Sequence, residues 1–144
     1  MPVISEMFVD QLITANRKMR TMFDARARQM GLTLSRARLL VQLAREDGQS
    51  QIRLAQLLDV EQPSIVGLVD ALEKAGMVER RADSSDRRQR NVHLTPAARE
   101  QAADLLAYVA RIRADILRDI PTEEIRCASD VLARVLANID RCTK

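Results

Sequence analysis

The stretch Gly48–Thr95 decides how this chain folds, and it reads GQSQIRLAQLLDVEQPSIVGLVDALEKAGMVERRADSSDRRQRNVHLT. Ser50 is a good N-cap, so the apolar residues after it predict a short helix. A second helix is expected from about Gln62, because Pro63 then occupies the first turn, where a missing N–H costs nothing. Gly76 ends this second helix. The first half of the stretch therefore predicts two short helices joined by a tight turn.

A β-hairpin is expected next. Residues alternate between apolar and polar in two runs, 77–81 and 90–94, and the polar segment 82–89 lies between them. By strand alternation, Val92 and Leu94 point toward the core.

Amphipathic helices are predicted on both sides of this stretch, because apolar residues recur there at three- and four-residue steps. The first helix ends at Gly31, and Thr33 caps a second one. After the hairpin, a long helix carries its apolar stripe as far as Ile120, and Pro121-Thr122 caps a last helix. The predicted fold class is mainly α with a small β-hairpin.

The length and composition fit a single domain over residues 1–144. Hydrophobic residues make up 47% but aromatic residues only 2%, so the core must be aliphatic. Residues 33–95 form the central module, and residues 1–30 and 97–144 form helical arms. Neither arm has an obvious partner in its own chain, so we expect the arms to join two copies in a two-fold dimer. A monomeric helical bundle is the alternative.

The positions of the charged residues say more about a binding partner than the net charge does, because a net charge of +3 is only mildly basic. The hairpin is crowded with arginines: Arg80, Arg81, Arg87, Arg88 and Arg90. An arginine at a loop tip can enter a narrow minor groove of DNA, where the negative potential is highest. A neighbouring carboxylate such as Asp86 can hold that arginine in one rotamer.

The outward face near the start of the second helix of the pair carries Gln62, Ser64, Val66 and Gly67, and Pro63 lies in the same first turn. A Gln amide can bond a base edge, Ser can bond bases or phosphates, and apolar groups can touch a thymine methyl. Together with the arginine-rich hairpin, this face indicates a helix-turn-helix with a DNA-contacting wing, whose partner is double-stranded DNA.

The chain resembles the MarR family of bacterial transcription regulators, and its SlyA-like branch in particular. The resemblance is carried by QSQIRLAQLLDVEQPSIV (49–66), DALEKAGMVER (70–80) and SDRRQRNVHLT (85–95), with weaker matches at 31–40 and 113–124. It implies a winged helix-turn-helix with N- and C-terminal helical dimerisation arms. The implied function is a homodimeric transcriptional regulator, a repressor, on a pseudo-palindromic operator.

The resemblance also implies roles for individual residues. Arg87 would lie in the minor groove with Asp86 orienting it, and the second helix of the pair would lie in the major groove. Further contacts would reach the DNA backbone from Ser50, Gln51, Arg88 and Arg90. Close relatives carry an arginine where this chain has Gly67, a departure that removes one base or phosphate contact.

Members of the family commonly bind small aromatic or phenolic acids between the DNA module and the dimer arms, and the ligand usually relieves repression. An anionic effector of this kind would need a guanidinium. The candidate ligand-binding residues are Arg17, Arg20, Arg36 and Arg38. No cofactor is implied.

Other classes of function find less support in the sequence. The one histidine, His93, falls on a strand, and no catalytic set, phosphate-binding glycine loop or metal-ligand spacing is present, so we expect no enzyme and no metal site. Thiol-based redox sensing in the same fold is the main alternative. Cys127 and Cys142 lie too far apart on one predicted helix to pair, and Cys142 is expected to pack along the apolar stripe. A helical interaction module without DNA binding is a third reading.

The cellular location follows from the same features. Two unpaired thiols, no signal-like N-terminus and no apolar run of about 20 residues predict a cytoplasmic protein with no membrane partner.

Overall fold

The computed structural model describes residues 1, 3–86 and 88–144. The chain divides into two compact units, residues 1–109 and 110–144. Within these described residues, six helices and a small antiparallel sheet confirm the predicted fold class. In chain order the elements are α1 Ile4–Gln29, α2 Leu34–Arg45, β1 Gln49–Ser50, α3 Gln51–Leu58, α4 Gln62–Lys74, β2 Val78–Ala82, β3 Arg90–Leu94, α5 Pro96–Ile116 and α6 Thr122–Cys142.

Several helix ends in the first unit lie at the predicted local signals, although α1 begins at Ile4 rather than at Ser5 or Asp10. Thr33 and Ser50 cap α2 and α3, because their side-chain oxygens accept from the backbone N–H three residues on, at 3.3 and 3.1 Å. Gly31 and Gly76 follow α1 and α4 with φ of 73° and 75°, a conformation that glycine adopts without strain. Asp59, with φ of 53°, ends α3 in the predicted tight turn.

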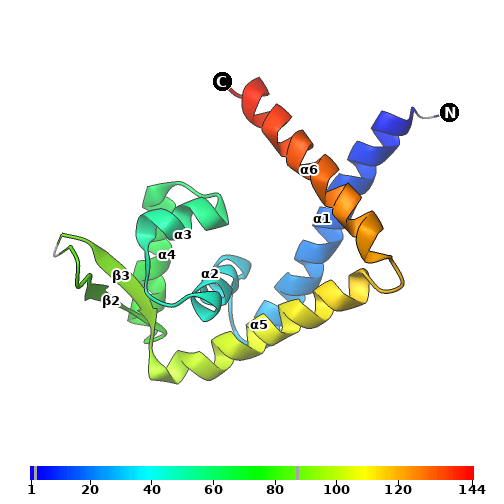
Figure 1. Ribbon diagram of the computed structural model, residues 1–144. Coiled ribbons are helices and arrows are strands. Elements are labelled where there is room, and N and C mark those ends of the chain that lie inside the picture. The colour runs from blue at the N-terminus through cyan, green and yellow to red at the C-terminus, as the bar shows by residue number, and fades with distance from the viewer. Residues whose placement is uncertain (2, 87) are drawn as a thin grey trace. The chain divides into compact units, whose positions relative to one another are not determined.

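The sheet has three antiparallel strands in the order β1-β3-β2. The predicted hairpin is confirmed, with register from Val78 opposite Leu94 to Ala82 opposite Arg90, and Figure 1 shows it as a ribbon that extends beyond α4. The sequence did not predict β1, since two residues are too few to show alternation. Gln49 fixes this strand because its amide donates to two carbonyls at the C-terminal end of α2, at 2.9 and 2.7 Å.

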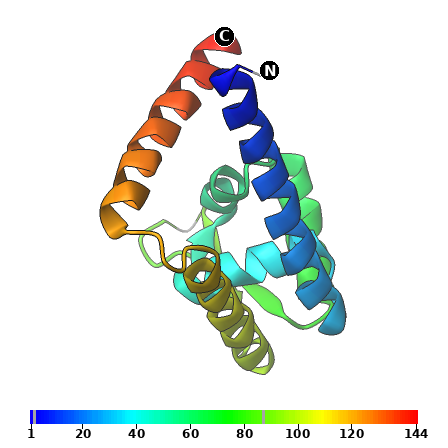
Figure 2. The ribbon, with the colours of Figure 1, turned by 90° about the vertical axis from the view of Figure 1, so that its right-hand side faces the viewer.

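The core lies in the first unit and is aliphatic, as the composition predicts. Its largest fully buried side chains are Leu39, Leu40, Leu43, Leu54, Ile65, Val69, Leu72, Val78, Val92 and Leu105. α1 joins this core through its last turns, where Ala27 is buried. The N-terminal half of α1 extends away from α2, α3 and α4 in both ribbon views (Figures 1 and 2).

The end of α5 corrects the sequence prediction. The helix stops at Ile116, and the stripe that was expected to reach Ile120 ends in a turn where Asp119 has φ of 61°. Pro121 explains the early end, because a proline disfavours helical geometry at the residue before it. Pro121 is the N-cap of α6 and Thr122 is its first residue, so the last helix begins at the predicted Pro121-Thr122.

α6 is amphipathic but uncovered within its own chain. All of its residues are described and none is buried; its exposed large apolar side chains are Val131, Leu132, Leu136 and Ile139. Cys127 and Cys142 are both free and exposed in the single chain, and the packing of Cys142 along the apolar stripe stays a prediction. No helix within the described ranges is long and apolar enough to cross a membrane.

Candidate nucleic-acid interface

The start of α4 presents the surface that the sequence predicted. Ile65, Val69 and Leu72 are fully buried, which fixes one side of α4 against the core. The predicted groove-facing residues are all exposed: Gln62, Pro63, Ser64 and Val66. Pro63 lies in the first turn, as expected. The N-terminal part of α4 therefore offers polar and apolar groups together on one accessible face.

The two candidate backbone contacts lie at the neighbouring start of α3. Ser50 caps α3 through its hydroxyl oxygen, which leaves its O–H able to donate. The Oε1 of Gln51 accepts from Nε and Nη2 of Arg80 at 3.0 and 2.9 Å. A guanidinium has only donors, so the amide oxygen of Gln51 must face it. The amide NH2 of Gln51 remains to donate, and it suits an acceptor such as a phosphate oxygen.

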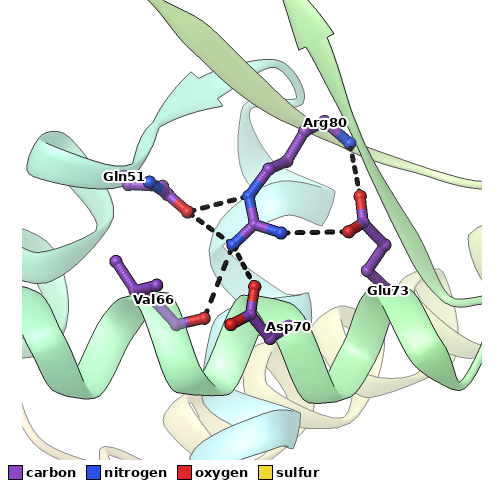
Figure 3. Close-up of polar contacts among 5 residues, drawn as sticks. All are labelled: Gln51, Val66, Asp70, Glu73 and Arg80. Carbon is purple, nitrogen blue, oxygen red and sulfur yellow. Dashed lines mark hydrogen bonds and ion pairs between the residues drawn. The ribbon is translucent and has the colours of Figure 1, made fainter.

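Arg80 is the centre of a polar cluster that joins three elements (Figure 3). Its side chain is only 14% exposed and forms ion pairs with Asp70 at 2.6 Å and with Glu73 at 3.0 Å. Its backbone N–H also donates to Glu73, and Nη2 reaches the carbonyl of Val66 at 3.5 Å. With the bonds to Gln51, these contacts tie β2 to α4 and to the first residue of α3.

Arg80, one of the arginines that crowd the hairpin, therefore has a structural role in this cluster. Two signals in the sequence could have found its structural role. Strand alternation places Arg80 on the same face of β2 as the buried Val78. Asp70 and Glu73 lie three residues apart on α4 and so share one helix face, which suits a single cation between them.

The tip of the hairpin is held by its own aspartates. Asp83 accepts from the backbone and the hydroxyl of Ser85, both at 3.1 Å, and Asp86 accepts from the backbone N–H of Arg88 at 2.9 Å. The side chains of Arg88 and Arg90 are exposed, and neither forms an ion pair with any described residue. Arg87, the predicted minor-groove residue, lies outside the described residues.

Arg81 differs from the tip arginines, because it pairs with Glu79 two residues away on the same strand. Half of its side chain remains exposed.

The four candidate effector-binding arginines come from two helices. Arg17 and Arg20 are exposed on α1, whereas Arg36 and Arg38 are half-buried on α2. Arg38 donates to the carbonyl of Leu58 at the end of α3, at 3.5 Å. This contact gives Arg38 a structural partner. Within the described part of the chain, no hydrogen bond or ion pair links the four arginines to one another or to a shared acidic group.

A helix pair with a tight turn, followed by a two-stranded wing, defines a winged helix-turn-helix. A model of the MarR family matches residues 32–89 of the chain. The whole chain is similar to the transcriptional regulator PA3341: 38% of residues are identical, the TM-score is 0.82, and the match covers 93% of this chain and 98% of that one. The chain belongs to the MarR family of transcriptional regulators.

Two further solved structures share the fold at lower identity. The MepR–DNA complex of S. aureus is 19% identical with a TM-score of 0.77, over 92% of this chain and 97% of that one. The transcriptional regulator SlyA is 18% identical with a TM-score of 0.78, over 93% of this chain and 94% of that one. Identities this low establish a common fold only.

Proposed function

We propose that the chain is a sequence-specific DNA-binding regulator that acts as a homodimer on a pseudo-palindromic operator of double-stranded DNA. One observation carries the proposal: Gln62, Pro63, Ser64 and Val66 are exposed at the start of α4, beside the start of α3, and Arg80 ties both elements together. The fold is also that of MepR, which was crystallised with DNA.

In this proposal α4 lies in the major groove. The amide of Gln62 has a donor and an acceptor and therefore suits the edge of an adenine, and Ser64 suits a base or a phosphate. Pro63 and Val66 offer apolar contact to thymine methyl groups. These contacts would read sequence, because they reach base edges rather than the sugar-phosphate backbone.

Contacts with phosphates would fix the position of the module on the duplex. Ser50 and Gln51 each have a donor that remains after their bonds within the protein. Arg88 and Arg90 would reach the phosphates beside the wing, and Arg87 would enter the minor groove. Asp86 would position Arg87 by holding the loop, since its carboxylate accepts from the next residue but one.

The helical arms would form the dimer. Large apolar side chains are exposed on α1 and on α6, among them Ile4, Phe8, Leu12, Ile13, Leu132, Leu136 and Ile139. Burying such surface against a second copy is favourable by about 25 cal/mol per Å². A two-fold dimer presents two recognition helices, which matches an operator with two related half-sites.

Regulation would be repression that a small aromatic or phenolic acid relieves, with Arg17, Arg20, Arg36 or Arg38 binding the acid group. Thiol-based sensing is the second candidate, because Cys127 and Cys142 are free and exposed. Operator affinity measured with and without peroxide separates the two. The assignment to the SlyA-like branch rests on the wing sequence at residues 85–95, and over 93% of the chain in each case the identity is 38% with PA3341 and 18% with SlyA.

Genomic footprinting followed by mobility-shift assays tests the central proposal. The recovered site should bind far more tightly than a scrambled duplex of the same composition. Arg87→Ala should then weaken operator binding by about 1–3 kcal/mol and leave the dimer intact. Arg28→Ala is the matched control, because Arg28 is an exposed arginine of α1 paired with Asp24 and should not affect binding. Equal affinity for both duplexes would overturn the proposal.

A further inference from the structure

Three of the four glycines have a conformational role, and the fourth does not. Gly31, Gly48 and Gly76 have φ between 73° and 75°, a region that other residues rarely adopt. Gly67 lies in the interior of α4 and does not have a positive φ. A glycine inside a helix weakens it relative to alanine, so this residue lowers the stability of α4.

Packing within the chain does not account for Gly67 either. A Cβ added there would meet no atom within 4 Å, so the protein itself leaves room for a side chain. The residue is exposed. Within the described residues neither backbone conformation nor packing accounts for a glycine at this position, and the exposed residue is accessible to a molecule that contacts α4 from outside.

Gly67 lies on the face of α4 that would enter the groove. It follows Pro63 by four residues and Ser64 by three, so the three share one helix face. The buried Ile65 lies roughly on the opposite side, as expected from 3.6 residues per turn. On this face the nearest exposed side chains one turn earlier are the apolar Pro63 and the polar Ser64, so Gly67 forms a gap beside Pro63.

We propose that Gly67 determines operator specificity by making room for a thymine methyl group. The thymine C5-methyl projects into the major groove and is the apolar group that distinguishes this base there. A gap without a side chain, bordered on its apolar side by Pro63, lets the α4 backbone approach that methyl closely. The inference rests on the proposed function, and it names one feature of the operator: a thymine opposite Gly67.

The inference is tested by adding one methyl group to the protein and removing one methyl group from the DNA. Gly67→Ala adds a methyl to the helix, and deoxyuridine in place of thymidine removes one from the footprinted operator. Gly67→Ala should melt a few degrees higher than the wild type, yet bind the thymine operator at least tenfold more weakly. Deoxyuridine at one position should restore the operator affinity of the variant to within about threefold of that of the wild type. Such a rescue is expected because two groups in contact show coupled effects on binding.

Three outcomes would overturn the inference. In the first, the alanine variant binds the thymine operator as the wild type does. In the second, no single deoxyuridine restores its binding. In the third, the variant is less stable than the wild type, because the chain itself would then require the glycine. Failure of the proposed function is distinguishable from these results, since the wild-type protein would then show no preferred genomic site.

Discussion

Replacing Arg80 by methionine removes the cation that joins α3, α4 and β2 while keeping a long unbranched side chain. The guanidinium and the backbone of Arg80 together reach Gln51, Asp70, Glu73 and the carbonyl of Val66. At 14% exposure, the side chain is the sheltered member of the cluster. Its loss should therefore destabilise the DNA module as a whole.

The magnitude follows from the exposure of its partners. A hydrogen bond to a charged group contributes about 1.5–3 kcal/mol when water is excluded. Asp70 and Glu73 are 61% and 44% exposed, so water replaces much of each ion pair, and about 0.5–1 kcal/mol remains for each. The two bonds to Gln51 contribute about 1 kcal/mol more. We expect Arg80→Met to lower the free energy of unfolding by about 2–3 kcal/mol.

Urea unfolding at one fixed protein concentration measures this change, since the stability of a dimer depends on concentration. Arg81→Met is the matched control, because Arg81 is half-exposed and its partner Glu79 lies on the same strand. The control should change the free energy of unfolding by less than about 0.5 kcal/mol. If both variants lose the same stability, or if Arg80→Met unfolds as the wild type does, the Arg80 cluster does not hold the module together.

Two further predictions concern the dimer and the turn before β1. Deleting residues 122–144 should abolish dimerisation, because α6 carries exposed apolar side chains that its own chain does not cover; sedimentation of a soluble dimer would contradict this role of α6. Gly48→Ala should cost about 1–3 kcal/mol in urea unfolding, because φ is 74° and the new Cβ would lie 2.7 Å from Cε1 of His93. Adding His93→Ala should recover only part of this loss, since it relieves the contact but not the backbone strain; full recovery would show that backbone strain contributes little.

The sequence by itself determined the elements that depend on near neighbours. Thr33 and Ser50 cap helices through bonds to residues three positions on, and Gly31 and Gly76 end helices through their own backbone freedom. The alternation at 90–94 predicted β3 with its bounds and with Val92 inward. These signals act over a few residues, so they can be read without knowing the fold. The resemblance to the MarR family was likewise visible in the sequence, in the longer stretches 49–66, 70–80 and 85–95.

Only the tertiary structure decided the features that join distant parts of the chain. β1 exists because residues 49–50 pair with β3, more than 40 residues away. Arg80, named in the sequence only as one of the hairpin arginines, belongs to a structural cluster because Asp70 and Gln51 meet it from two other elements. The gap at Gly67 became visible only when its surroundings were known to be empty. Such contacts depend on how helices and strands pack, and no pattern of neighbouring residues specifies which distant groups will meet.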